Sequence, residues 1–423
     1  MSTTDAMRGL TPQQRTTFIA SFLGWSLDAF DFFLVIVTVP HIAHDFHAAV
    51  KDVAVAVTIT LMLRPAGALI FGWLADRYGR RIPLMADVAL YSVLELATAF
   101  SPNLTVFIVL RALYGVAMGG EWGLGAALAM ESLPAQKRGI FSGILQEGYA
   151  VGYLLAAIVL AVLYVHIGWR GMFVIGVLPA LLIFYIRSYV PESAAWLAGR
   201  AQKIAGGADS IAQSIKMRWP LFIYAVVFMA AFNYMSHGTQ DLYPTFLSQQ
   251  HGFSPALTGT LTAIMNVGAI IGGVLFGWLS QRFGRRNMIM VCVGFGIALI
   301  PLWAYSQTAV ALGVGAFLMQ VVVQGAWGII PAHLNEISPR TMRGTFPGLT
   351  YQLGNLISAN ALQLEAAFAA DKFPTPSGHP DYAKAMAVVA IVVFVAVFIL
   401  AAIGNFVIPE RRHEPFVKPA VRS

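Results

Sequence analysis

The 423-residue chain is poor in charge and contains a single cysteine. Charged residues make up 11% of it and hydrophobic residues 58%, whereas a soluble domain has about 25% charged residues. Cys292 has no partner for a disulfide within the chain, and we expect it to pack as a small hydrophobic residue in an apolar run. This composition indicates a membrane protein.

Several functional motifs are also absent. The sequence has no Gly-x-x-x-x-Gly-Lys-Ser/Thr phosphate loop, no Cys/His metal set and no nucleophile elbow. ATP-driven transport, a bound metal or cofactor and an enzyme activity therefore have no support. The first seventeen residues are polar and lack the apolar core of a signal peptide.

Long apolar runs dominate what remains. A helix needs about 20 apolar residues to cross a bilayer, and the runs lack the alternation of a β-barrel wall. The sequence therefore predicts an all-α integral membrane protein with twelve transmembrane helices. The expected spans cover roughly 17–40, 54–75, 82–101, 104–125, 140–164, 168–189, 219–247, 256–280, 287–306, 308–331, 343–369 and 384–408.

The placement of the basic residues predicts the topology. Twelve spans put both ends on one side, and most of the 27 lysines and arginines lie in the ends and in the loops of that side. The opposite loops carry only Lys51, Arg170, Lys372 and Lys384. We therefore expect both termini to be cytoplasmic in a plasma (inner) membrane, and we read the net charge of +7 as topology rather than as nucleic-acid binding.

The chain contains an internal repeat. Gly72-Trp73-Leu74-Ala75-Asp76-Arg77-Tyr78-Gly79-Arg80-Arg81 recurs 205 residues later as Gly277-Trp278-Leu279-Ser280-Gln281-Arg282-Phe283-Gly284-Arg285-Arg286, and the same offset relates Glu131 to Glu336 and Arg138 to Arg343. Parallel repeats of this length are typical of transporters. We expect an N-tail (1–16), a six-helix bundle (17–189), a linker (190–218), a second six-helix bundle (219–408) and a C-tail (409–423).

The first repeat copy resembles the loop signature Gly-x-x-x-Asp-Arg-x-Gly-Arg-Arg of the major facilitator superfamily, and the second departs from it at Gln281. The echo of Pro191-Glu192 after the sixth span in Pro409-Glu410 after the twelfth resembles its sugar-porter-like branch. The resemblance implies a monomer working by alternating access, with a cytoplasmic gate in which Asp76 pairs with Arg80 and Arg81, Glu131 with Arg138, and Glu336 with Arg343. The expected gate residues are Asp76, Arg77, Arg80, Arg81, Glu131, Arg138, Arg282, Arg285, Glu336 and Arg343.

Charges within the membrane are costly and usually functional. Asp28 and Asp31 lie three residues apart in the first span and share a helix face. Their repulsion raises the proton affinity of one of them, which suits a proton carrier. We expect one of them to pair with Arg111, with Arg64 as the rival partner. Glu121, Glu147 and Asp241 are further candidates, and Glu95 is a weaker one because the third helix of such a half usually packs outside the cavity.

The seventh span is dense in polar residues. Gly238 and Pro244 should break its helix where only a wet cavity or neighbouring protein can satisfy the freed backbone groups. The segment resembles, at each defined position, the signature Asn-x-x-Ser/Thr-His-x-Ser/Thr-Gln-Asp-x-x-x-Thr of the lactate permease and sialate:proton symporter family. The resemblance implies roles in substrate binding and proton handling. The expected substrate-binding residues are Asn233, Ser236, His237, Thr239, Gln240, Asp241, Thr245, Arg111, Gln146 and Asn355.

These features predict a proton-coupled symporter for a small organic acid, such as lactate or pyruvate. The fifth span lacks the Gly-Pro dipeptide of proton-drug antiporters, and the linker has no room for the two extra spans of the sialate members. Sialate or another organic acid remains an alternative substrate. A non-transporting sensor with a transporter fold is a distant alternative, and a membrane enzyme is more distant still.

Overall fold

The computed structural model describes residues 9–204, 216–375 and 378–416. Within them the chain is helical, and the only β-bridge joins Pro374 to Pro380. The first half contains the helices α2 (Pro12–Asp45), α3 (Val50–Tyr78), α4 (Arg81–Ala99), α5 (Leu104–Ser132), α6 (Arg138–Gln146), α7 (Gly148–Ile175) and α8 (Ala180–Tyr189). A short helix, α9 (Ala194–Ile204), follows within the linker.

The second half repeats this pattern with more interruptions. It contains α11 (Trp219–Gln240), α12 (Tyr243–Thr245), the π-helix η2 (Phe246–Gln250), α13 (Pro255–Phe283), α14 (Arg285–Ala304), α15 (Ala309–Trp327), α16 (Ile330–Ile337), α17 (Phe346–Ser358), α18 (Ala361–Lys372) and α19 (Tyr382–Val407). Two 3-10 turns, η1 (Ala135–Lys137) and η3 (Arg340–Met342), occupy corresponding loops of the two halves.

In the described residues, eleven helical segments are long and apolar enough to cross a membrane. The expected eleventh span, 343–369, is not among them because its helix is interrupted at Ala359 and Asn360, which leaves the two shorter helices α17 and α18. Together these two helices complete twelve membrane-crossing segments. The sequence did not predict this interruption, since neither residue is a glycine or proline.

Local chemistry sets several helix ends. Thr11 accepts from the backbone of Gln14 while the Gln14 side chain accepts from the backbone of Thr11, which forms a capping box at the start of α2. At the other end of the second helix in each half, Gly79 and Gly284 adopt φ values of 103° and 104°. A side chain would be strained in this conformation, which explains why both repeat copies carry glycine there.

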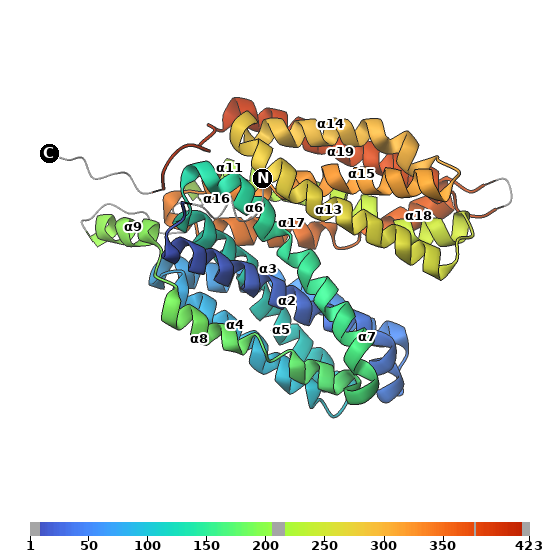
Figure 1. The fold of residues 1–423 in the computed structure, drawn as a ribbon, viewed down its shortest axis with the longest axis horizontal. Coiled ribbons are helices and arrows are strands. Elements are labelled where there is room, and N and C mark those ends of the chain that lie inside the picture. Colours follow the sequence, from blue (N-terminus) through green and yellow to red (C-terminus); the bar gives the residue numbers. More distant parts are fainter. Residues whose placement is uncertain (1–8, 205–215, 376–377, 417–423) are drawn as a thin grey trace.

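Figure 1 shows two bundles, one formed by α2–α8 and the other by α11–α19, which meet near α6, α16 and α17 and diverge toward the opposite end. Leu10 and Phe416 pack in one cluster with Leu133 and Ile140, so both ends of the described chain lie where the bundles meet. We call this end of the molecule the termini side.

Candidate functional site

The seventh membrane segment is broken where the sequence predicted. Helix α11 ends at Gln240, a turn follows, and α12 begins around Pro244, which has no N–H to continue a helical ladder. His237 and Asp241 flank the break, and His237 Nδ1 lies 2.8 Å from Asp241 Oδ2. Their side chains are 34% and 29% exposed. A hydrogen-bonded imidazole and carboxyl group are therefore accessible at a break in a membrane helix.

We call the expected substrate-binding residues of the seventh segment the α11 strip: Asn233, Ser236, His237, Thr239, Gln240, Asp241 and Thr245. Residues of other C-half helices complete this strip. Gln324 of α15 donates to Ser236 Oγ at 3.2 Å and to Gln240 Oε1 at 3.5 Å, and Asn355 of α17 lies next to the His237 ring. Three helices of the C-half therefore supply polar groups around His237, and Asn355 is one of the expected substrate-binding residues among them.

Other residues of the expected strip are occupied locally. Asn233 donates to Met229 O at 2.8 Å and Thr239 donates to Met235 O at 2.8 Å, both within α11. Both are buried. Thr245 is half-buried beyond the break. The side chains of Asn233 and Thr239 are therefore hydrogen-bonded within their own helix, and Thr245 lies at the edge of the strip.

Arg64 is the basic residue of the N-half that approaches this strip. Its guanidinium lies close to Tyr351 of α17, one helical turn from Asn355, while its Nε and Nη2 have no hydrogen-bond partner among the described residues. Tyr149 of α7 lies near Arg64, Tyr351 and Asp241, close enough to feel their charges. Residues of both halves thus surround the same region.

Arg111 is placed differently from our expectation. Its guanidinium forms an ion pair with Glu95 of α4, and it lies 3.7 Å from the centroid of the Tyr114 ring. The expected pairing with Asp28 or Asp31 is therefore wrong for this structure, and Arg111 is enclosed in the N-half away from the α11 strip. Burial favours this arrangement because a buried guanidinium requires a close carboxylate.

The N-half contains more buried carboxyl groups than buried cations in its core. The side chains of Asp28 and Asp31 are fully buried, and none of their four oxygens has a hydrogen-bond partner among the described residues. Asp87 of α4 and Glu121 of α5 are also buried, and none of their four oxygens has a hydrogen-bond partner among the described residues.

Asp87 was not among the expected functional residues, and Glu95 was expected only as a weaker candidate for the proton carrier. Both lie in the expected third span, where a charged residue indicates a functional role. This indication was given little weight because the third helix was expected to pack outside the cavity. Gln146 is buried and accepts from Trp122 Nε1 at 3.2 Å. Glu147 follows it at the junction of α6 and α7, with its carboxyl group against Gly273 of the other half.

On the termini side, the two repeat copies form matching ion pairs. Arg80 contacts Asp76 at 3.1 Å and Glu131 at 3.0 Å, and Arg285 contacts Glu336 at 2.7 Å and Gln281 at 2.7 Å. Burial disfavours the Arg80 cation, but Glu131 and Asp76 outweigh burial and raise the pKa of Arg80 above its ordinary value. Each second copy residue thus repeats the role of its counterpart.

Several expected pairs within this network are wrong. Glu131 pairs with Arg80 rather than Arg138, and Glu336 pairs with Arg285 rather than Arg343. Each carboxylate lies in the last turn of the helix before its loop, where the arginine of the motif reaches it in a bidentate contact.

The remaining arginines of the expected gate take other positions. Arg81 donates through its backbone to Glu192 at 3.2 Å and through its side chain to the carbonyl of Arg187. Arg77 and Arg282 are exposed and lie over neighbouring aromatic rings. These three form no ion pair in the described residues.

Asp76 and its counterpart Gln281 also connect the two halves. Asp76 accepts hydrogen bonds from Gly344 N at 2.7 Å and from Thr345 N and Oγ1 at 3.0 and 2.7 Å. Gln281 accepts from Gly139 N at 3.2 Å. Gly139 and Gly344 are themselves counterparts in the repeat, so the same contact is made twice in opposite directions. The charged copy makes three bonds and the neutral copy makes one.

The C-terminal segment lies across this contact. The Phe416 ring lies 3.5 Å from the guanidinium of Arg138 and 3.9 Å from that of Arg343, measured to the ring centroid. Arg138 also donates to the Glu414 carbonyl at 2.9 Å. Since Arg138 begins α6 and Arg343 precedes α17, one aromatic ring joins cations of both halves. No sequence pattern indicated this role for Phe416.

These contacts define the conformation. The hydrogen bonds between the halves, including Ala332 N to Ser142 Oγ at 2.9 Å, lie on the termini side, where the bundles meet in Figure 1. The α11 strip lies toward the Gln240 end of α11, away from Trp219 at the start of this helix. The structure is therefore closed on the termini side.

Comparison with known proteins agrees with this architecture. A family model described as the Major Facilitator Superfamily matches residues 21–362. The chain is 32% identical over 447 residues to a Saccharomyces cerevisiae protein named carboxylic acid transporter protein homolog, with 99% of this chain and 71% of that protein covered. It is 29% identical over 352 residues to the sialic acid transporter NanX of Escherichia coli, with 82% and 85% covered.

A solved structure of the proton:xylose symporter XylE bound to 6-bromo-6-deoxy-D-glucose is similar with a TM-score of 0.72 and 18% identity, covering 94% of this chain and 96% of that one. At this identity the likeness concerns the fold. Because the family model spans more than half of the chain and the fold agrees, this protein is a multi-pass membrane transporter, not an enzyme, and belongs to the major facilitator superfamily.

Proposed function

We propose that this transporter moves a small organic acid together with a proton, and that its substrate is a monocarboxylate such as lactate or pyruvate. The observation that carries this proposal is the broken α11 with its accessible His237–Asp241 pair. The Saccharomyces cerevisiae relative at 32% identity is named as a carboxylic acid transporter homolog, which supports the same substrate class.

Substrate binding follows from the donors around the break. A carboxylate needs cationic or N–H donors, and Nε and Nη2 of Arg64 have no hydrogen-bond partner among the described residues. His237 offers a second donor from the opposite half. Ser236 and Gln240 suit the hydroxyl or keto oxygen beside the carboxylate. A substrate held between Arg64 and His237 bridges the two halves, which is the arrangement that alternating access requires.

Proton coupling follows from the buried acids. Asp28 and Asp31 have no hydrogen-bond partner for their oxygens among the described residues, and an ionised carboxylate in such a place is costly. We propose that one of them takes the proton, with Arg64 nearby and with Glu121, Glu147 and Asp241 as further acceptors. A negative substrate at Arg64 changes the charge that Asp28 meets, and this links the two events.

The orientation of the protein in the membrane decides which side of the transporter is closed. With both termini in the cytoplasm of a plasma (inner) membrane, the closed termini side is the cytoplasmic gate, and the structure is the outward-facing state of a monomer. Opening requires the Asp76 and Gln281 contacts to break. A positive excess on the termini side supports this orientation.

Sialic acid is the second candidate substrate, because NanX is named as a sialic acid transporter and covers 82% of this chain. Proteoliposomes given an inward proton gradient should take up labelled lactate or pyruvate and not sialic acid. Protein-free liposomes correct for passive entry of undissociated acid. Uptake of sialic acid alone would favour the second candidate, and uptake of none of these acids would contradict the proposal.

Two variants tie the uptake to the α11 strip. His237→Ala should abolish or strongly weaken it. His379→Ala removes an exposed histidine whose side chain makes no hydrogen bond or ion pair in the described residues, and it should leave uptake unchanged. Equal uptake by the two variants would contradict a substrate role for the strip.

A further inference from the structure

A basic pocket opens on the termini side, outside the contact between the halves. It has a volume of about 530 Å³ and lies where the start of α11, the η3 turn and the segment after α19 come together. Its lining residues are Met217, Arg218, Pro339, Arg340, Thr341, Pro409, Arg411 and Glu414. Three arginines from three separate segments face one glutamate, so the formal charge of the lining is +2.

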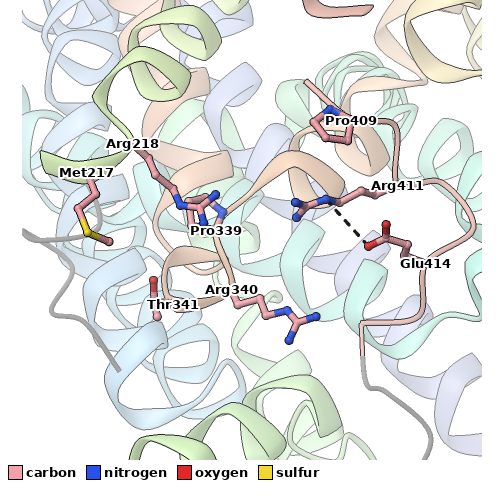
Figure 2. A pocket seen from close by; sticks show the side chains of 8 residues that line it. All are labelled: Met217, Arg218, Pro339, Arg340, Thr341, Pro409, Arg411 and Glu414. Atoms are coloured by element: carbon pink, nitrogen blue, oxygen red, sulfur yellow. Dashed lines mark ion pairs between the residues drawn. The ribbon is translucent and has the colours of Figure 1, made fainter. Parts of the chain in front are cut away.

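Figure 2 shows the guanidinium groups of Arg218 and Arg411 extending toward one another, with Arg340 on the neighbouring turn. Arg411 reaches Glu414 only at 4.0 Å. Arg218 and Arg340 are exposed, and neither side chain has a hydrogen bond or ion pair within the described part of the chain. The three guanidinium groups that line the pocket repel one another, so an anion that contacts all three would relieve this repulsion.

The pocket lies where two helices leave the apolar layer. Arg218 directly precedes Trp219, which is 58% exposed at the start of α11, and a tryptophan at a helix end is typical of the membrane interface. Phe406 and Val407 at the end of α19 are 92% and 70% exposed, as lipid-facing residues are, and Pro409 follows two residues later. The pocket is therefore at headgroup level.

We propose that this pocket binds a phosphate group, supplied by the headgroup of an anionic phospholipid or by free phosphate. Guanidinium groups match phosphate oxygens in geometry and charge, and basic pockets between membrane helices bind anionic headgroups. This site is separate from the α11 strip and does not depend on which acid is transported.

Occupancy of the pocket acts on the C-terminal segment. Arg411 and Glu414 belong to that segment, and the Glu414 carbonyl accepts from Arg138 of the N-half. A phosphate group that fixes Arg411 against Arg218 and Arg340 holds this segment over the closed gate. The bound phosphate therefore stabilises the conformation seen here.

The test uses purified full-length protein in phosphatidylcholine nanodiscs. One arm adds inorganic phosphate against chloride at equal ionic strength, and the other replaces part of the lipid by phosphatidylglycerol. Thermal unfolding midpoints are measured, since a ligand that binds the folded state raises them. A rise with inorganic phosphate identifies free phosphate as the source. A rise only with phosphatidylglycerol identifies the lipid headgroup.

The pocket variant is Arg218→Gln with Arg340→Gln. Its matched control is Arg187→Gln with Arg200→Gln, two exposed arginines outside the pocket with the same change in net charge. We expect the midpoint shift to persist in the control and to be lost in the pocket variant, with an apparent affinity at least about tenfold weaker.

Radiolabelled phosphate binding and co-purified phosphatidylglycerol give a second readout that does not depend on unfolding. No shift in either arm, or equal responses of the pocket and control variants, would overturn the proposal.

Discussion

Replacing Asp76 by asparagine changes the contact between the halves without changing its shape. Both carboxylate oxygens of Asp76 accept from donors of the other half: Oδ1 from Gly344 N, and Oδ2 from Thr345 N and Oγ1. Asparagine has one oxygen, so its amide NH₂ must face a backbone N–H. The variant also loses the charge that pairs with Arg80 at 3.1 Å.

The expected magnitude follows from these contacts. A hydrogen bond to a charged group contributes about 1.5–3 kcal/mol, and we expect the variant to lose one such contribution from the closed termini side. At about 1.4 kcal/mol per factor of ten, the equilibrium should shift about 10- to 150-fold toward opening of that side. If the two states differ by a few kcal/mol, this shift makes the minor state visible.

Spin-label distances can measure the shift. Tyr78 and Phe283 are counterparts on the termini side, and Phe100 and Tyr305 are counterparts at the other end; all four are at least half exposed. Labels on cysteines at these pairs, in a Cys292→Ala background, report the two ends separately. In Asp76→Asn the first distance should lengthen and the second should shorten.

Asp52→Asn is the matched control for this variant. Asp52 lies in the first turn of the same helix, α3, and is exposed, so the control loses the same charge at the opposite end. Its distance distributions should match those of the parent. Distributions in Asp76→Asn that are indistinguishable from those in Asp52→Asn would refute the assignment of this contact as the gate.

The other perturbations concern the strip, the buried acids and the C-terminal segment. Asp241→Asn should strongly weaken uptake at near-normal expression because it removes the carboxylate partner of His237. Normal transport by this variant would contradict a substrate role for the α11 strip. Asp28→Asn and Asp31→Asn imitate a protonated acid, so at least one should exchange substrate across the membrane without concentrating it; parent-like accumulation by both would place the proton carrier elsewhere. Phe416→Ala removes two cation–π contacts of about 0.5–1 kcal/mol each, so spin-label distances should shift toward an open termini side about 5- to 30-fold, and unchanged distances would exclude a role for the ring in closure.

The sequence predicted the features that depend on local pattern. The repeat identified Arg80 with Arg285 and Glu131 with Glu336 as counterparts. Pro244 lies beside the break after Gln240, whereas Gly238, the other expected breaker, is helical within α11. These features follow from spacing and from backbone chemistry, both of which a sequence contains.

Features that depend on the packing of distant helices could not be obtained in this way. Arg111 pairs with Glu95 because α4 lies against α5, whereas the sequence showed only that both residues lie within spans. The choice of Arg80 over Arg138 as the partner of Glu131 depends likewise on how a loop folds back. The interruption at Asn360 and the position of Phe416 require contacts that the one-dimensional pattern does not contain.

Proton coupling is the central claim, and a comparison of driving forces tests it most directly. A monoanion that moves with one proton transfers no net charge, so a membrane potential, worth about 2.3 kcal/mol per charge per 100 mV, does no work on it. A pH gradient should drive accumulation by about 1.4 kcal/mol, or tenfold, per pH unit.

The measurement is uptake of labelled lactate or pyruvate into proteoliposomes under a pH gradient alone and under an inside-negative potential alone. We expect accumulation with the pH gradient, little effect of clamping the potential, and no concentration with the potential alone. Strong accumulation driven by the potential alone would contradict one-to-one coupling and would indicate more than one proton per anion, and absence of accumulation with the pH gradient would contradict proton coupling altogether.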